Sequence, residues 1–122
     1  MKTKSIELSA LNRESKQWGV ICLKADKGVV TITFSSELEE GLSFLNQVIQ
    51  LDERDAYVAQ LLFGGFLSSP VFIGDNHRIV VGEQDEITKF DVWVPNAFFE
   101  SMELEMPTEG FNKIGSFIFN NI

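Results

Sequence analysis

Two apolar stretches on either side of a glycine turn constrain the fold of this chain more than any other feature. Residues 18–25 are apolar and rich in β-branched side chains, and residues 29–34 alternate between apolar and polar side chains. The segment Asp26-Lys27-Gly28 between them has the composition of a tight turn, because glycine adopts positive φ at little steric cost. The pattern therefore predicts an antiparallel β-hairpin. The residues that share one face of its second strand are Val30, Ile32 and Phe34.

Two helices in succession are predicted after the hairpin. Ser36 followed by Glu39 matches the capping-box pattern, and apolar residues then recur with helical spacing. The first helix is therefore expected to begin after Ser36 and to end near Gln50. The second helix is expected to begin near Asp52, where acidic side chains suit the positive end of the helix dipole, and to end at Gly64.

The C-terminal half of the chain is predicted to be mostly sheet. Short apolar or alternating stretches are separated by segments rich in glycine, aspartate and asparagine, which is typical of a meander. The expected strands are 71–73, 78–81, 87–94 and 117–119, and the expected turns or loops are 74–77, 82–86 and 107–110. Residues 5–10 are expected to add one further strand.

Residues 96–106 fit two patterns. Asn96 can cap a short helix that runs through Met102. Alternatively, a short turn precedes a strand in which Met102, Leu104 and Met106 alternate with polar and acidic side chains. We favour the turn and strand, because the alternation places the acids on one wet face.

These elements predict one α+β domain that spans residues 1–122. A chain of 122 residues has the usual length of a single domain, and an apolar fraction of 44% is enough for a hydrophobic core. We expect an antiparallel sheet, built from the N-terminal hairpin and the C-terminal meander, packed on the helix pair. Eleven phenylalanines predict a core with extensive aromatic packing.

The single cysteine and the N-terminus bear on location. Cys22 lies in an apolar run and is expected to be a buried, inert thiol. One cysteine cannot form an internal disulfide, which suits a reducing compartment. Residues 1–5 are not followed by the apolar segment of a secretory signal, and no apolar stretch has membrane-spanning length. We therefore expect a cytoplasmic protein that does not enter a membrane.

The sequence carries no recognised catalytic, metal or cofactor motif. His77, the one histidine, lies beside Asp75 in a predicted turn and is expected to be a surface residue. One cysteine and one histidine cannot supply a closed zinc site, and glycine-rich phosphate motifs are absent. Capping and the helix dipole explain the acids at the predicted helix starts. We expect a non-enzyme without metal or cofactor, unless folding brings His77 and two carboxylates into one cleft.

Charge is unevenly distributed along the chain. Residues 1–34 have a net charge of +3, residues 35–110 have a net charge of −12, and the whole chain has a net charge of −8. Such a field repels nucleic acid and anionic membranes and attracts basic proteins, although the same charge can serve solubility alone. We expect the basic residues near Trp18 to be solvated rather than to bind nucleic acid. These residues are Lys2, Lys4, Arg13 and Lys16.

In size, acidic charge and lack of catalytic residues, the chain is similar to immunity proteins that block bacterial nuclease toxins, without a shared motif. This profile predicts an acidic binding protein that neutralises a basic protein partner, with an exposed aromatic anchor such as Tyr57, Trp93 or Phe99. The alternatives are a small-ligand domain with a Phe-lined pocket and a phage-type protein that mimics DNA. The residues expected to contact the partner are Glu37, Glu39, Glu40, Asp52, Glu53, Asp55, Tyr57, Glu83, Asp85 and Glu86. A further acidic cluster consists of Glu100, Glu103, Glu105 and Glu109.

Overall fold

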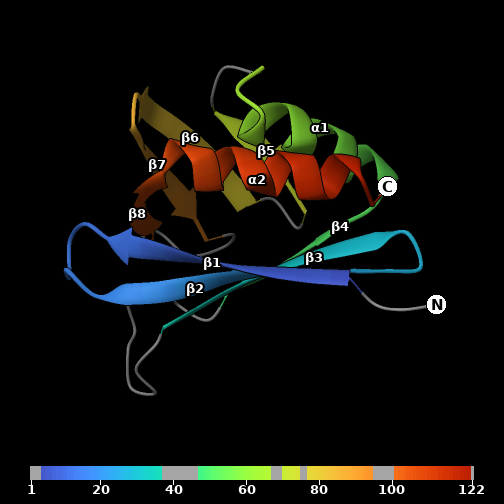
Figure 1. The fold of residues 1–122 in the computed structure, drawn as a ribbon, viewed down its shortest axis with the longest axis horizontal. Helices are drawn as coiled ribbons and strands as arrows, with labels where there is room; N and C mark the ends of the chain where they lie inside the picture. The colour runs from blue at the N-terminus through green and yellow to red at the C-terminus, as the bar shows by residue number, and fades with distance from the viewer. Residues whose placement is uncertain (1–3, 37–46, 67–69, 75–76, 95–100, 122) are drawn as a thin grey trace.

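One antiparallel sheet and a pair of helices form the fold (Figure 1). The computed structural model describes residues 4–36, 47–66, 70–74, 77–94 and 101–121. The elements are, in chain order, β1 (Lys4–Asn12), β2 (Trp18–Asp26), β3 (Val29–Ser36), β4 (Val48–Leu51), α1 (Glu53–Phe63), β5 (Val71–Ile73), β6 (His77–Gln84), β7 (Ile87–Trp93), β8 (Ser101–Pro107) and α2 (Thr108–Phe119). The strands lie in the order β4-β3-β2-β1-β8-β7-β6-β5. The predicted fold class, an antiparallel α+β sheet packed on two helices, is confirmed.

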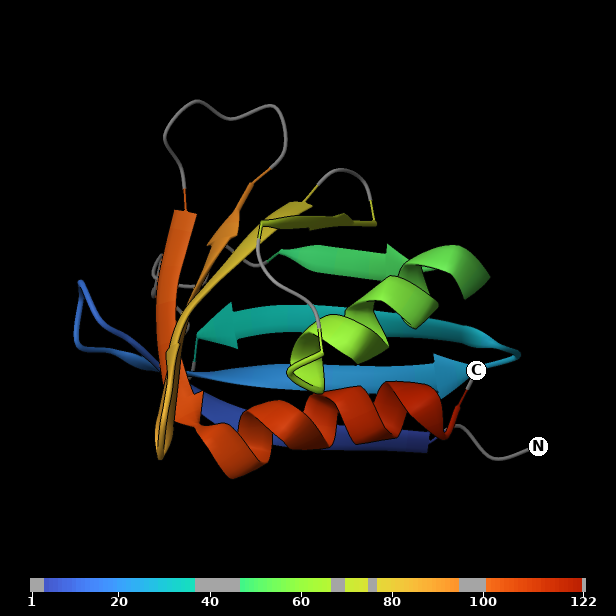
Figure 2. The same cartoon turned by 90° about the horizontal axis from the view of Figure 1, so that it is seen from above.

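The order of elements repeats along the described chain. Strands β1–β4 are followed by α1, and strands β5–β8 are followed by α2. β1 pairs with β8 and so joins the two halves into one sheet. Both helices lie on the same side of β1–β3, and strands β6–β8 run across the direction of these N-terminal strands (Figure 2). The sheet therefore curves around the helix pair like an incomplete barrel.

The predicted hairpin is confirmed as β2 and β3. Lys27 and Gly28 have φ angles of 52° and 79°, as the two central residues of a type I′ turn require. Asp26 and Val29 pair across the turn. The side chains predicted to share one face of β3 are buried, and they are Val30, Ile32 and Phe34.

The two edge strands, β4 and β5, are brought together by contacts from the connection between β5 and β6. Gly74 lies so close to β4 that a Cβ added to it would be 2.5 Å from Cγ2 of Ile49. The imidazole Nε2 of His77 lies 3.1 Å from Oε1 of Gln47. The Gly74 amide also donates a hydrogen bond to the Asp55 carboxylate of α1. These contacts nearly close the sheet.

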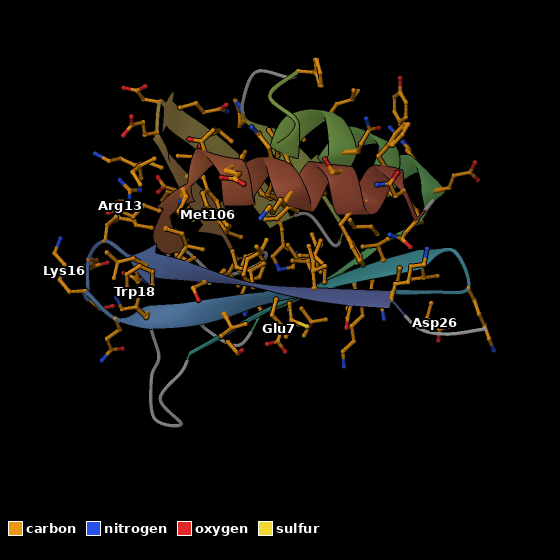
Figure 3. The ribbon with its side chains drawn as sticks, viewed as in Figure 1. Glu7, Arg13, Lys16, Trp18, Asp26 and Met106 are labelled. Carbon is orange, nitrogen blue, oxygen red and sulfur yellow. The ribbon has the colours of Figure 1, made fainter. Side chains whose placement is uncertain are left out.

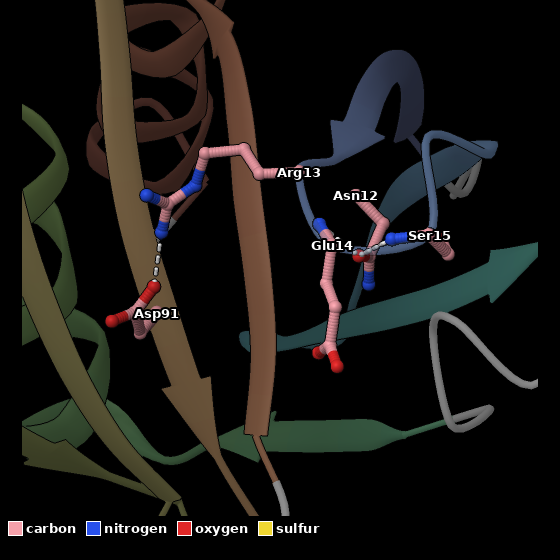
Figure 4. A network of polar contacts seen from close by, with 5 residues as sticks. All are labelled: Asn12, Arg13, Glu14, Ser15 and Asp91. Atoms are coloured by element: carbon pink, nitrogen blue, oxygen red, sulfur yellow. Dashed lines mark hydrogen bonds and ion pairs between the residues drawn. The ribbon is translucent and has the colours of Figure 1, made fainter.

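The loop between β1 and β2 is held by two side chains. The buried Asn12 Oδ1 accepts hydrogen bonds from the backbone N–H groups of Glu14 and Ser15, at 3.0 and 3.1 Å (Figure 4). Arg13 reaches across β8 and forms an ion pair with Asp91 of β7. The loop is therefore fixed to the C-terminal strands as well as to its own hairpin.

An aromatic cluster joins the helices to the sheet. The ring centroids of Phe63 in α1 and Phe111 in α2 are 4.9 Å apart, and the rings of Phe111 and Phe90 in β7 are 5.1 Å apart. All three side chains are buried. These phenylalanines fill the core by packing on one another, which agrees with the predicted aromatic core.

Strand β4 corrects the prediction of a helix that ends near Gln50. Ile49 and Leu51 are buried while Val48 and Gln50 are exposed, and all four residues pair with β3. This alternation has the period of a strand, and cross-strand pairing stabilises it more than local helix propensity would. The rest of that predicted helix, residues 37–46, lies outside the described residues.

Helix α2 corrects the prediction of a final strand at 117–119 and of a loop at 107–110. The helix begins at Thr108 and ends at Phe119. Its buried side chains are Phe111, Ile114 and Ile118, which follow helical spacing. Gly110 and Gly115 lie beside these residues and lower helix propensity, which concealed this period in the sequence.

Two predicted side-chain environments are also wrong. His77 is buried, with 3% exposure, because it begins β6 and packs toward Gln47 instead of lying in a surface turn. Cys22 is only partly buried, because it occupies the outer face of β2, opposite Glu7 and Thr33. Figure 3 shows Glu7 on that outer face, away from the helices.

The other predicted strands are confirmed, β5 with the predicted bounds and the others with shifted ends. The strand expected at 5–10 is β1, and the strand favoured over a helix for 96–106 is β8. Strand β6 continues to Gln84 through an irregularity after Val81, so the turn expected at 82–86 is shorter than predicted.

Candidate functional site

A groove at the start of α1 is the candidate functional site. It has a volume of about 1130 Å³ and lies between the β2–β3 turn and the first two turns of α1. The described residues that line it are Gly28, Asp52, Glu53, Arg54, Tyr57 and Val58. One wall is therefore a tight hairpin turn, and the other is the acidic beginning of a helix.

Asp52 positions this part of the helix. It is the N-cap of α1, and its Oδ1 accepts a hydrogen bond of 2.8 Å from the backbone N–H of Asp55. An aspartate is a favoured N-cap because it satisfies an amide that has no partner within the helix. The acidic Glu53 then lies in the first turn, where the helix dipole stabilises negative charge.

Tyr57 gives the groove an exposed aromatic side chain. It has 60% of its surface exposed and lies one turn after Glu53, on the same side of α1. The half-buried Val58 lies one turn after Arg54 and adds an apolar side chain to the lining of the groove. A carboxylate, a phenol and a guanidinium are thus presented together on two turns of one helix.

The groove has an excess of negative charge. Asp52, Glu53 and Asp55 carry three carboxylates, against the one guanidinium of Arg54. Burial and the charge of Asp52 raise the pKa of Asp55, while the Gly74 amide and Arg54 lower it. Asp55 itself turns toward Gly74, so it contributes to the field of the groove without lining it.

The structure brings together only part of the predicted contact set. Asp52, Glu53 and Tyr57 line the groove, and Asp55 lies beside them. Gly28, Arg54 and Val58 were not predicted as site residues. Arg54 and Val58 directly follow Glu53 and Tyr57 and repeat their i, i+4 spacing, which was a usable signal, but the contribution of Gly28 depends on the tertiary fold. The predicted residues Glu37, Glu39 and Glu40 lie outside the described residues.

The other predicted acids lie at the opposite end of the molecule. Asp85 and Glu86 form the β6–β7 turn, which Thr108 of α2 binds through hydrogen bonds of 2.6 Å to the Asp85 carbonyl and 2.9 Å to the Glu86 carbonyl. Glu109 follows Thr108, so this turn and the start of α2 form a separate acidic end. Figure 2 shows it far from the start of α1. Glu83 precedes this turn in β6.

The remaining predicted acids and aromatic anchors that the structure describes do not line the groove. Glu103 and Glu105 are half-buried on β8. Trp93, a predicted anchor, is half-buried, and the guanidinium of Arg78 lies 5.3 Å from its ring centroid. Glu100 and Phe99 lie outside the described residues.

The basic residues of the N-terminal segment do not form one patch. Arg13 is paired with Asp91. Lys16 lies by Trp18 at the β1–β2 loop, whereas Lys4 pairs with Ala25 near the other end of the hairpin, which Asp26 marks in Figure 3. The expectation that these residues are solvated is wrong for Arg13, because it is ion-paired with Asp91, whereas Lys4 and Lys16 are exposed. Lys2 lies outside the described residues.

Within the described ranges, no group of three or more His, Cys, Asp and Glu side chains is placed to hold a metal ion. No helix in those ranges is long and apolar enough to span a membrane. Comparisons with known protein families, curated proteins and solved structures found no match to this chain.

Proposed function

We propose that this protein is a non-enzymatic binding protein whose groove at the start of α1 docks onto a basic protein partner. One observation carries the proposal: Asp52 and Glu53 converge with the exposed Tyr57 on the same groove. Carboxylates steer a basic partner into contact, and tyrosine supplies a rigid, amphipathic anchor that slows release.

The most concrete form of the proposal is an immunity protein that blocks a nuclease-type toxin. A nuclease presents basic side chains to the phosphates of its substrate, and an acidic groove is complementary to such a surface. Docking there would occlude the substrate path without chemistry by the inhibitor. The net charge of −8 supports this reading, as does the single cysteine, which suits a cytoplasmic location.

The test is capture of a partner from the source organism with tagged protein, at low and at high salt, followed by mass spectrometry. The groove variant carries Asp52→Asn, Glu53→Gln and Tyr57→Ala, because asparagine preserves the helix cap while removing charge. The control variant carries Asp85→Asn and Glu86→Gln at the other acidic end.

We expect the wild type and the control variant to capture the same basic protein, more weakly at high salt, and the groove variant to lose it. A nuclease assay on the captured protein then tests the immunity function directly. The proposal fails if no basic protein is captured at either salt, or if the groove variant retains it as well as the wild type does.

A further inference from the structure

Strand β1 has an edge that is open over most of its length. On one side it pairs with β2 from Lys4 to Leu11, but on the other side it meets β8 only at Leu11 and Asn12. Among the described strands, residues 4–10 of β1 therefore have a neighbour on one side only. This open edge is longer than either end strand of the sheet, because β4 has four residues and β5 has three. A long unpaired edge is a template for a further strand.

The hydrogen bonds between β1 and β2 show which backbone groups face the open edge. The backbone N–H of Asn12 donates a hydrogen bond of 2.9 Å to the Gln17 carbonyl. Because hydrogen-bonded pairs alternate along an antiparallel ladder, every second residue of β1 directs its N–H and C=O groups away from β2. Within the open edge these residues are Ser5, Glu7 and Ser9, and each of them is exposed. Their backbone donors and acceptors therefore follow one another at the spacing that a neighbouring β-strand would match.

A hollow of about 250 Å³ adjoins the open edge. Leu8 and Ser9 line it from β1, and Met106 and Gly110 line it from the end of β8 and the start of α2. The side chain of Leu8 is only half-buried, and Gly110 brings no side chain to cover it. Figure 3 shows Met106 on the helix side of β1. An apolar side chain that arrives beside Leu8 on this side can therefore enter the hollow and complete the burial of Leu8.

We propose that the open edge of β1 binds an extended segment of a partner protein, which adds a strand to the sheet. The backbone of this segment forms hydrogen bonds with Ser5, Glu7 and Ser9, and every second side chain points toward the hollow. In this mode of binding the main-chain hydrogen bonds supply affinity, and the hollow selects an apolar side chain. The charged residues in its lining, Glu109 and Lys113, have opposite charges and lie 3.8 Å apart, so they do not select a charged one.

The backbone of the edge specifies this occupant. A helix satisfies its own backbone groups, so it cannot pair with a row of N–H and C=O groups as an extended segment can. A second copy of the chain fits less well. Two copies that pair symmetrically over residues 4–10 would place their Glu7 side chains directly opposite each other, and like charges in that position are destabilising. The hollow at the edge shares no described lining residue with the acidic groove, so the two sites are separate.

The test is selection of binders to the full chain from a displayed library of random peptides, followed by calorimetry with the selected peptides after synthesis. We expect the selected peptides to carry apolar side chains at alternate positions. Hydrogen exchange at the backbone amides of Ser5, Glu7 and Ser9 should slow when a peptide is bound, because these N–H groups become hydrogen-bonded. The variant that removes Asp52, Glu53 and Tyr57 from the acidic groove should bind the peptides as the wild type does, so the two proposals fail independently.

Two variants at one position isolate the backbone of the edge. Glu7→Pro removes the N–H that faces the open edge and leaves the hydrogen bonds to β2 in place, because proline is tolerated where the N–H of an edge strand faces solvent. Glu7→Thr removes the same carboxylate but keeps the N–H, so it is the matched control. We expect Glu7→Pro to raise the dissociation constant of the peptides at least roughly tenfold and Glu7→Thr to leave it unchanged.

Three results would overturn the proposal. The first is a selection that yields no peptide, and the second is a peptide that binds Glu7→Pro as tightly as it binds Glu7→Thr. The third is a dimer of the free chain in which the same β1 amides are protected, since the edge would then belong to a second copy. Circular dichroism confirms that both variants are folded, and exchange in the wild type tests the edge without any substitution.

Discussion

Gly115 of α2 packs directly on the backbone of Gly64 at the end of α1. A Cβ added to Gly115 would lie 2.9 Å from the Gly64 nitrogen and 3.1 Å from the Gln60 carbonyl oxygen. Both of these atoms belong to the backbone, which cannot rotate away as a side chain does. The position of α2 against α1 therefore depends on the absence of a side chain at residue 115.

Replacing Gly115 with alanine should separate the helices and destabilise the fold. We expect the free energy of unfolding to fall by about 1–3 kcal/mol, as for overpacked cores. Gly110→Ala is the matched control in the same helix, because its Cβ would meet the flexible end of Met106 at 3.1 Å and otherwise only Cδ2 of Leu8, at an ordinary contact distance of 3.9 Å. Urea unfolding measures both variants. Equal losses in the two would show that helix contact at Gly115 is unimportant.

Replacing Gly74 with alanine should open the contact between the edges of the sheet. Gly74 has a φ of 61°, and its added Cβ would lie 2.5 Å from Ile49, so the variant combines backbone strain with a clash. Gly28→Ala isolates the strain, since Gly28 has a φ of 79° and nothing within 4 Å of its added Cβ. We expect a loss of about 1–2 kcal/mol for Gly28→Ala and a clearly larger loss for Gly74→Ala. A loss of stability for Gly74→Ala that is no larger than the loss for Gly28→Ala would contradict the close contact between Gly74 and Ile49.

Replacing Arg13 with methionine should destabilise the protein more at neutral pH than in acid. Burial raises the pKa of Asp91 above 3.8, Arg13 lowers it and Glu103 raises it. Protonation of Asp91 therefore favours the folded state, and this contribution is lost as the pH rises through the folded-state pKa. Without Arg13 the folded-state pKa of Asp91 rises further, so the ionised carboxylate destabilises the folded state more.

We expect Arg13→Met to lower the free energy of unfolding by about 1–3 kcal/mol at neutral pH and by less below pH 3.8, where Asp91 is protonated in both states. Urea unfolding at the two pH values measures the difference. Lys24→Met, which removes an exposed charge from β2, is the control. A loss for Arg13→Met that does not change with pH would refute the role given to Asp91.

Replacing Asp52 separates its capping role from its charge. Asp52→Ala removes the acceptor for the Asp55 N–H and should lower the free energy of unfolding by about 1 kcal/mol, whereas Asp52→Asn keeps an acceptor and should change it little. Burial and the Asp52 charge both raise the pKa of Asp55, so Asp52→Asn should lower that pKa toward 3.8. Carbon NMR of the Asp55 carboxyl follows this shift, and an unchanged pKa would contradict the coupling.

Local patterns were enough to predict the hairpin, helix α1 and strands β7 and β8. In these segments the turn residues, the cap and the apolar period agree with one another, as Asp52 and the Lys27-Gly28 turn illustrate. The acidic character of the candidate site could also be predicted from the sequence, because helix capping and the helix dipole favour carboxylates at the start of α1.

The elements and side-chain environments that local patterns did not predict depend on pairing and packing between distant segments. Residues 48–51 became a strand because β3 offers them a partner, and residues 117–119 became helical because Phe111, Ile114 and Ile118 are buried together. The same packing buried His77, placed Gly28 opposite α1, and kept the acids of the β6–β7 turn away from the groove. The sequence by itself determined the local periods, the caps and the charge of this protein. The tertiary structure alone decided which charges share a surface, because contacts between residues far apart in the chain outweigh local propensity.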